Sequence, residues 1–372
     1  MRPLQATPGP ETPAPAPLIA VDRAIAELRR GGVVAIRGED GAAVVHVLAA
    51  EAVSPESLAA LSVRTNTAPV LAVTGRRARV LGLGRDDDAV MRLSAPGGLT
   101  VDLVAGLADP CLNGPRPDLG AVIATPAAPG CPVTQAVALA KLARLLPAVV
   151  AIEGGAVAPD QMQVAAADIA AYQVNAARTL RVVSQARVPL AGAEQARIVA
   201  FRPADGGIEH LAIVIGEPDL DRPVLARLHS ECFTGDLLGS LRCDCGDQLK
   251  GAIAEIAQSG SGVLLYLAQE GRGIGLVNKL RAYQLQDDGF DTLDANGQLG
   301  FDDDERIYQP AAQMLRLLGV GAVRLMTNNP LKVGQLAAHG IEVAERVPHV
   351  FPANDHNRSY LSTKATKGGH LF

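Results

Sequence analysis

The chain has 372 residues, which leaves room for two domains with ordinary hydrophobic cores. Its 48% hydrophobic and 20% charged residues are typical of a soluble globular protein, and its net charge of -5 argues against general nucleic-acid binding. No apolar run approaches the ~20 residues that span a bilayer, and the N-terminus shows no signal segment. We therefore expect a cytoplasmic protein with no nucleic-acid or membrane partner.

The first half of the chain begins with a polar tail and continues as an α/β pattern. Residues 1–17 contain six prolines and no hydrophobic periodicity, which predicts a flexible tail. From Leu18 the spacing of apolar residues changes. The expected elements are helices over residues 21–30, 133–146 and 165–174, and strands over 33–36 and 148–152.

A second α/β unit begins near residue 195. A glycine-rich loop, EGRGIG at 270–275, is expected to follow a strand and to open into a helix that includes Tyr283. Pro330 is placed as the first residue of another helix, a position that proline favours. The expected strands cover 210–216, 224–229, 263–267 and 322–326, and further helices cover 248–257 and 310–318.

Three of the five cysteines form a cluster with the spacing C-x(10)-C-x-C: Cys232, Cys243 and Cys245. In a reducing compartment, such a cluster indicates a site for a single zinc ion rather than a disulfide framework. A structural zinc usually has four protein ligands, whereas a catalytic zinc has three and keeps one position for water. The spacing alone leaves open a four-ligand structural site completed by His229. Cys111 and Cys131 lack metal spacing and are expected to be ordinary core or loop residues.

Several runs in the second half carry a family resemblance. In chain order they are RLHSECFTGDLLGSLRCDCGDQL, QEGRGIGLVNKLRAYQLQDDGFDT, LGFDDDERIY, LMTNNPLKV and YLSTKATKGGHL. Together they resemble GTP cyclohydrolase II over about residues 196–372. The resemblance implies a domain over residues 193–372 with a mixed sheet and flanking helices. It also implies zinc-dependent hydrolysis of GTP to formate, pyrophosphate and a phosphoribosylamino-diaminopyrimidine, the first step of riboflavin biosynthesis.

The resemblance assigns catalytic roles to residues of this sequence. One zinc per chain would be held by the three cysteines, and Tyr283 would orient a water or stabilise the oxygen that develops at C8 of the guanine. Asp304 and Arg306 match the residues assigned as proton acceptor and nucleophile at the α-phosphate. Because arginine has a pKa above ~12, we favour a charged Arg306 that clamps the phosphoryl group. Asp304 would then hold Arg306, or bind Mg²⁺ with Asp302 or Asp303.

The resemblance also implies a GTP site and a homodimer. Arg227, Arg272 and Lys332 would face the triphosphate, which carries Mg²⁺, and the glycine-rich loop would offer backbone amides to phosphate oxygens. Glu270 would accept hydrogen bonds from the guanine edge or the ribose. The remaining expected GTP contacts are Leu228, His229, Ser230, Glu231, Gln248, Gly271, Thr292 and Thr327.

Residues 18–192 are similar to 3,4-dihydroxy-2-butanone 4-phosphate synthase, as judged from AIAELRRGG, VVAI, LAAEAVSPE and GCPVTQAVALAKLARLLPAVVAIEGG. That family needs an acidic loop for Mg²⁺, whereas this chain has RGEDGAA at 37–43, where only Glu39 and Asp40 are acidic. Val133 stands where the family has its metal-binding histidine. The resemblance therefore implies a folded domain that no longer catalyses.

Two other functions compete with a single GTP cyclohydrolase II activity. A bifunctional enzyme would also make the butanone phosphate, which the missing acidic loop argues against. A catalytically inactive nucleotide-binding relative would show losses at the cysteines, Tyr283, Asp304 or Arg306, and all six residues are present.

Overall fold

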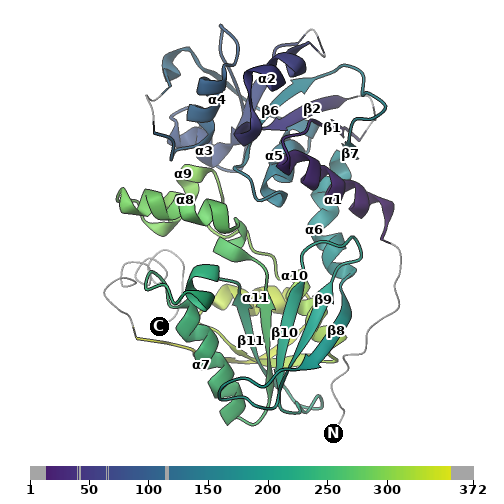
Figure 1. Cartoon of the computed structure of the whole chain (residues 1–372), viewed down its shortest axis with the longest axis vertical. Helices are drawn as coiled ribbons and strands as arrows, with labels where there is room; N and C mark the ends of the chain where they lie inside the picture. The colour runs from purple at the N-terminus through teal and green to yellow at the C-terminus, as the bar shows by residue number, and fades with distance from the viewer. Residues whose placement is uncertain are drawn as a thin grey trace. The chain divides into compact units, whose positions relative to one another are not determined.

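The structure is a computed structural model that describes residues 14–39, 41, 43–63, 65, 67–113 and 117–352. It contains two seven-stranded sheets with flanking helices, which confirms the expected mixed α/β fold class (Figure 1). The last quoted run, at 360–371, and residues 1–13 lie outside the described part of the chain. Among the described residues, no helix is both long and apolar enough to cross a bilayer.

The chain forms two compact units, and each unit combines stretches that are separate in the sequence. The first, here called the cysteine unit, contains Gln173–Gly273 and the described residues from Arg306 onward. The second, here called the composite unit, joins Pro15–Tyr172 to the later segment Ile274–Glu305. The family-based boundary between residues 192 and 193 stays a prediction, because it concerns ancestry and the units reflect packing.

The sheet of the composite unit has the strand order β5-β4-β3-β6-β2-β1-β7, in which only the β1–β7 pair is parallel. Its central strands are buried because helices cover them. The strands are β1 Val34–Arg37, β2 Val44–Ala49, β3 Val70–Thr74, β4 Val90–Ser94, β5 Ile123–Pro126, β6 Ala148–Glu153 and β7 Gln163–Ala165. The helices are α1 Ala16–Arg29, α2 Pro55–Ser62, α3 Gly75–Val80, α4 Val101–Ala108, α5 Pro132–Leu142, α8 Leu276–Asp287 and α9 Thr292–Leu299, while α6 Ala166–Arg178 contains the division between the units.

Two expected boundaries in the first half were wrong. Helix α1 begins at Ala16, so the last two residues of the expected tail are helical. Proline is tolerated there because the N–H groups of the first turn have no partner within the helix. Helix α5 ends at Leu142 and not at 146, since Arg144 adopts φ +57°. The amide of Leu145 then donates to the Ala140 carbonyl, which closes the helix end.

The sheet of the cysteine unit has the order β14-β13-β11-β12-β10-β9-β8. The strands β11 to β14 form parallel pairs, and β12, β10, β9 and β8 pair antiparallel. Its strands are β8 Arg181–Arg187, β9 Ala196–Arg202, β10 His210–Ile215, β11 Val224–Ser230, β12 Gly262–Leu267, β13 Ala322–Met326 and β14 Glu342–Val347. Its further helices are α7 Cys245–Gln258, α10 Gln309–Leu317 and α11 Pro330–Ala338.

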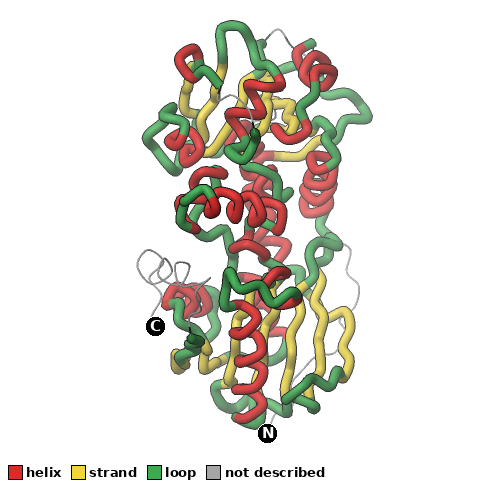
Figure 2. The backbone as a smooth tube through the Cα atoms, turned by 60° about the vertical axis from the view of Figure 1, so that its left-hand side comes forward, coloured by secondary structure: helices red, strands yellow, loops and turns green. Residues whose placement is uncertain are grey.

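Alternation along the parallel strands gives this sheet two apolar faces. Leu225 and Leu264 pack with Ile256 of α7, which lies along one face of the sheet (Figure 2). Ala226 and Leu265 point the other way, into a core that includes α10. Strands β11 and β12 are therefore buried on both sides, and their carboxyl ends lead into the cysteine cluster and the glycine-rich loop.

Candidate functional site

The three cysteines meet at the junction of β11 and α7. Cys232 follows β11, a turn at Phe233–Leu237 reverses the chain, and Cys243 and Cys245 lie at the start of α7. All three Sγ atoms lie within 4.8 Å of one another, with 3.7 Å between those of Cys232 and Cys243. A Cβ at Gly235 would lie 2.8 Å from Cys243 Sγ, so only glycine lets the turn approach the sulfurs this closely.

The chemistry of this sulfur cluster fits a bound cation. The hydrogen bond with Cys232 and burial raise the pKa of Cys243 to about 11, against an opposing hydrogen bond with Cys245, and hydrogen bonds with Cys232 and Cys243 together with burial raise the pKa of Cys245. Three thiolates in one buried place repel one another, and a metal ion removes that repulsion. Soft sulfur ligands suit zinc. Within the described ranges, this is the group of three or more His, Cys, Asp or Glu side chains with metal-binding geometry.

His229 does not complete the cluster as a fourth ligand. Its Nε2 lies 3.1 Å from both carboxylate oxygens of Asp236, and its ring stacks on Tyr266 with 5.6 Å between centroids. Burial lowers the pKa of His229, although Asp236 opposes that shift. The four-ligand structural site therefore loses His229 as its candidate fourth ligand, and the group that could hold a metal ion consists of the three cysteines.

Asp236 is a site residue that the sequence reading missed. Its Oδ2 accepts hydrogen bonds from the Cys232 amide at 3.0 Å and from the Tyr266 hydroxyl at 2.9 Å. The carboxylate therefore fixes the backbone of the first cysteine and the ring beside it. The available signal was its place four residues after Cys232, where a carboxylate can accept from the backbone of a tight turn.

Arg227 and Gln248 join β11 to α7 beside the sulfurs. Arg227 donates from Nη1 to the Met326 carbonyl at 2.9 Å and from Nη2 to Gln248, whose amide in turn donates to Asp244. Burial lowers the pKa of Arg227 to about 10, against the opposing effect of Asp244 and Cys245. The guanidinium therefore keeps its charge at neutral pH and supplies positive potential next to the cysteine cluster.

The glycine-rich loop is tied to the cysteine turn through Glu270. Its Oε2 accepts from the Phe233 amide at 2.6 Å, and its Oε1 accepts from the Gly271 amide at 3.0 Å. Both oxygens thus accept from backbone amides, and the expected contact of Glu270 with the guanine or the ribose stays a prediction. Gly271 and Arg272 both have left-handed φ values, of 63° and 61°. For Arg272 this conformation is costly, and such strain is concentrated at functional sites.

A second group of expected GTP contacts lies at the end of β13 and the start of α11. The Asn329 amide donates to Thr327 Oγ1 at 3.0 Å, and the Asn329 side chain caps α11 by accepting from the Leu331 amide at 2.9 Å. Lys332, in the first helical turn, donates to the Leu228 carbonyl at 2.8 Å. A buried cation therefore lies at a helix N-terminus, where anions are favoured.

Ser230 and Glu231 lie between β11 and the first cysteine. The Glu231 amide donates to the Leu267 carbonyl, which continues the pairing of β11 with β12. Ser230 Oγ is buried and has no hydrogen-bond partner among the residues that the structure describes, and the same holds for Arg227 Nε. Two buried polar atoms near the cysteines are thus left for a ligand or water to satisfy.

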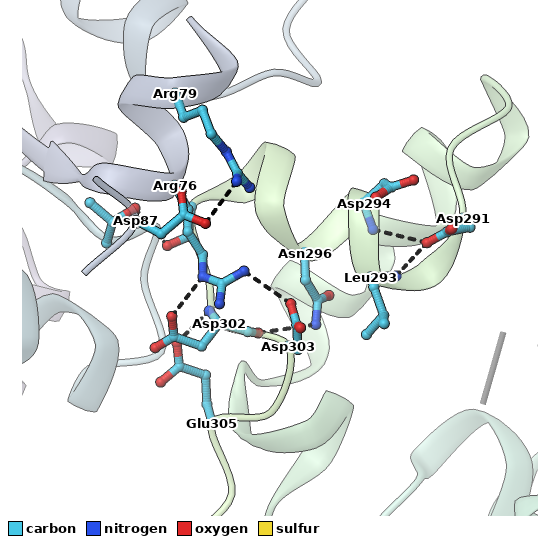
Figure 3. Close-up of polar contacts among 12 residues, drawn as sticks. Arg76, Arg79, Asp87, Asp291, Leu293, Asp294, Asn296, Asp302, Asp303 and Glu305 are labelled. Atoms are coloured by element: carbon cyan, nitrogen blue, oxygen red, sulfur yellow. Dashed lines mark hydrogen bonds and ion pairs between the residues drawn. The ribbon is translucent and has the colours of Figure 1, made fainter. Parts of the chain in front are cut away.

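Three expected site residues lie in the composite unit. Tyr283 is half-buried on α8 with Lys279 Nζ 5.6 Å from its ring centre, Thr292 begins α9, and Asp304 is exposed. Arg306 and the other expected site residues belong to the cysteine unit. Asp302 pairs with Arg76 through Oδ1 (Figure 3). Its Oδ2 pairs with Lys141, so both oxygens already have cationic partners, and a role in binding Mg²⁺ with Asp304 stays a prediction.

The expected catalytic positions of the first half show no metal site within the described ranges. Val133 is buried in α5 with 1% exposure, and Arg37 donates to Gln163 at 2.7 Å. Glu39 is exposed, and Asp40 lies outside the described residues. The first half is therefore folded at these positions, and its lack of catalysis stays a prediction.

Taken together, the fold and the cluster define a mixed α/β protein with a group of three cysteines that could hold a metal ion. The family model described as GTP cyclohydrolase II matches residues 180–348. A GTP cyclohydrolase-2 from Azospirillum brasilense is 58% identical over 364 residues, which cover 95% of this chain and 94% of that protein. The chain therefore belongs to the GTP cyclohydrolase II family, and it is an enzyme of that family.

Shorter relatives match about half of the chain. A GTP cyclohydrolase-2 from Escherichia fergusonii is 53% identical over 193 residues, which are 52% of this chain and 97% of that protein. A solved two-domain 3,4-dihydroxy-2-butanone 4-phosphate synthase from A. baumannii covers 89% of this chain and 99% of its own, with 18% identity and a TM-score of 0.34. That likeness is too weak to carry an argument, and the ancestry of the first half stays a prediction.

Proposed function

We propose that the chain hydrolyses GTP to formate, pyrophosphate and a phosphoribosylamino-diaminopyrimidine, the first step of riboflavin biosynthesis. One observation carries the proposal: a buried three-cysteine cluster in a chain that is 58% identical over 364 residues to a GTP cyclohydrolase-2. The substrate is GTP, and the reaction opens the guanine ring and removes the terminal two phosphates.

One zinc per chain would be held by Cys232, Cys243 and Cys245. When bound, zinc in such a site acts as a Lewis acid and lowers the pKa of water at its open position. The chain itself shapes the surroundings. Asp236 fixes the Cys232 backbone, and Glu270 fixes the next residue, Phe233, so the first ligand is held from two sides.

Positive charge and backbone donors around the cluster would bind the triphosphate together with Mg²⁺. Arg227 and Lys332 are buried cations, and Lys332 stands in the first turn of α11. Ser230 Oγ has no partner among the described residues and would bond to the substrate. The left-handed pair Gly271 and Arg272 would turn backbone amides toward a phosphate.

Arg306 would clamp the phosphoryl group during pyrophosphate release. Supporting this role, the charge of Arg306 contributes to the lowered pKa of Arg227. A clamp requires only a charged guanidinium, which is the ordinary state of arginine. The roles of Asp304, Tyr283 and Thr292, like the GTP contacts of Leu228, His229, Glu231, Gln248 and Thr327, are proposed from the family resemblance.

The assembly we propose is a homodimer. Supporting it, the cysteine turn carries exposed apolar side chains that a partner would cover: Leu237, Leu238 and Leu241 are 70%, 65% and 58% exposed. A cytoplasmic location belongs to the same proposal, because a three-thiol metal site is best maintained in a reducing compartment. Molar mass measured in solution would test the dimer.

The proposed reaction is tested by incubating the purified, zinc-containing protein with GTP and Mg²⁺ and measuring three products. We expect formate, pyrophosphate and the diaminopyrimidine in equal amounts. Cys245→Ser is the matched negative control, since it removes one ligand while preserving size. Binding of GTP without any product would favour the catalytically inactive relative instead.

A further inference from the structure

The segment Ile274–Glu305 carries Tyr283, Thr292 and Asp304, yet it packs with the first half of the chain, Pro15–Tyr172. Helices α8 and α9 lie beside each other, and α9 lies beside α3 (Figure 1). The buried apolar cluster at this junction takes Leu146 from the first half. Its other members come from the segment: Ile274, Ala282, Leu285, Ala295, Leu299 and Phe301.

The first half also satisfies the C-terminal end of α9. Thr74 Oγ1 donates to the Gly300 carbonyl at 2.7 Å, and Arg77 Nη1 donates to the Gln298 carbonyl at 2.8 Å. Carbonyls at the end of a helix have no partner within it, and positive charge is favoured there. Arg77 is 3% exposed and also bonds to the Leu107 carbonyl, so its position is fixed from both sides.

The start of α8 is held in a similar way. Asn278 Nδ2 donates to the Arg144 carbonyl at 3.0 Å, and Arg281 pairs with Asp109 at 3.1 Å and with Glu51. A Cβ at Gly275 would lie 3.1 Å from the Arg144 side chain, which shows how closely the two backbones approach. Arg281 is only two residues from Tyr283, so these contacts fix the turn of α8 that carries the tyrosine.

Ion pairs hold the C-terminal end of the segment through residues on both sides of Asp304. Arg76 pairs with Asp302 at 2.9 Å and with Asp303 at 3.1 Å (Figure 3). Lys141 pairs with Asp302 at 2.9 Å and with Glu305 at 2.7 Å. Burial alone would lower the pKa of Lys141, but the two carboxylates outweigh it and raise the pKa. The ammonium is therefore charged whenever the carboxylates are.

We propose that the first half, Pro15–Tyr172, is a positioning domain that holds residues 274–305 in the conformation needed for GTP hydrolysis. The inference rests on the proposed roles of Tyr283, Thr292 and Asp304. The matched 193 residues make up 97% of the E. fergusonii relative, which is too short to contain both halves, so the positioning role is proposed for this longer chain alone. Thr74, Arg76, Arg77 and Lys141 are positioning residues, because they act through the segment.

The test uses full-length, zinc-containing protein and the double variant Arg76→Gln/Lys141→Gln. Arg79→Gln is the matched control: it lies on the same helix, and its ion pair with Asp87 at 2.8 Å stays within the first half (Figure 3). Hydrogen exchange of the amides in 292–305, kcat and KM for GTP, and zinc content would be measured. The double variant removes the four ion pairs of Arg76 and Lys141, and their combined loss corresponds to an effect of about tenfold on the exchange rate and on kcat.

In the double variant we expect about tenfold faster exchange in 292–305 and a fall in kcat of about the same size. Zinc content should stay at the wild-type level, and the control should match wild type throughout. The conservative variant Arg76→Lys/Lys141→Arg should recover most of kcat, which a general loss of folded protein would not predict. Faster exchange with unchanged kcat and KM would overturn the proposal, as would unchanged exchange.

A second pair of variants covers the case in which the double variant does not fold. Thr74→Val removes the hydrogen bond to Gly300 together with the cap of α3, whereas Thr100→Val removes only the equivalent cap of α4. A lower kcat in Thr74→Val alone supports positioning, and equal effects in both variants overturn it. Absence of formate from the wild-type protein would instead refute the proposed function, so the two failures are distinguishable.

Discussion

At the scale of single residues, the three thiols at the junction of β11 and α7 would repel one another as thiolates, and a bound cation would remove that repulsion. Their Sγ atoms lie within 4.8 Å of one another and are largely shielded from water. Cys243→Ser removes one soft ligand and keeps the size of the side chain, so the zinc content should fall from about one per chain to well below half. Metal analysis of purified protein checks this. A variant that keeps its full zinc would remove Cys243 from the ligand set.

Asp236 should contribute to the stability of the same site. Asp236→Ala leaves the Cys232 amide and the Tyr266 hydroxyl without their acceptor. An unsatisfied buried donor costs about 1–3 kcal/mol, so we expect the free energy of unfolding to fall by about 2 kcal/mol and zinc to be lost more readily to a chelator. Denaturant unfolding and chelator competition measure the two effects. Asp236→Asn keeps one acceptor oxygen and should lie between wild type and Asp236→Ala.

Arg306 allows a test between charge and covalent chemistry. Arg306→Lys keeps the positive charge but loses the planar fork, so an electrostatic clamp predicts reduced pyrophosphate release that stays measurable. Arg306→Ala should lose more of it. Pyrophosphate release by both variants gives the comparison, with zinc content as the folding control. A guanylyl adduct on Arg306, detected by mass spectrometry of the wild-type protein, would contradict the clamp.

At the scale of helices and strands, apolar periodicity predicted the core elements well. The strand over 322–326 matches β13, and the helix begun by Pro330 is α11. The wrong end of helix α5 arose from contacts between residues that are distant in the sequence. Helix α5 ends four residues early because Arg144 turns left-handed, and Gly275 packs against that residue from 131 positions later in the chain. Local periodicity carries no information about such a contact.

Helix α7 provides a prediction at this scale. Gly→Ala inside a helix normally stabilises by about 1 kcal/mol, but a Cβ at Gly251 would lie 2.1 Å from the Phe351 ring. Gly251→Ala should therefore lower the melting temperature, because Phe351 must leave its place beside His349. Gly334→Ala in α11 is the control and should raise the melting temperature, since outside its own helix no atom of the described residues would lie within 4 Å of the added Cβ. A higher melting temperature in both variants would contradict this prediction and show that Phe351 moves without a cost in folding free energy.

At the scale of the whole chain, family motifs predicted the cysteine site but not the division into compact units. The runs around Cys232, Tyr283 and Arg306 appear as one continuous domain in sequence, whereas Ile274–Glu305 packs with Pro15–Tyr172. The contacts that join them, such as Thr74 with Gly300, span 226 positions. Neither partner is chemically unusual, so a single sequence gives no reason to pair them. A similarly long separation hid the ion pairs of Asp302 with Arg76 and Lys141, because the sequence offered Asp302 only as a possible Mg²⁺ ligand beside Asp304.

The first half should hold its segment and carry no chemistry of its own. Val133 is buried where the resembled synthase family has a metal-binding histidine, and Glu39 is an exposed carboxylate without a metal-binding group around it in the described ranges. Enolisation of a sugar phosphate needs a hard oxygen cage for Mg²⁺ and a base. The full-length protein, active on GTP in the same preparation, should therefore release no formate from ribulose 5-phosphate, even with abundant Mg²⁺. Val133→His supplies the histidine of the resembled synthase family at this position. We expect this variant to stay inactive on ribulose 5-phosphate, because the acidic loop is still absent. Turnover of ribulose 5-phosphate by the unmodified protein would establish the bifunctional alternative and show that the first half both positions the segment and catalyses.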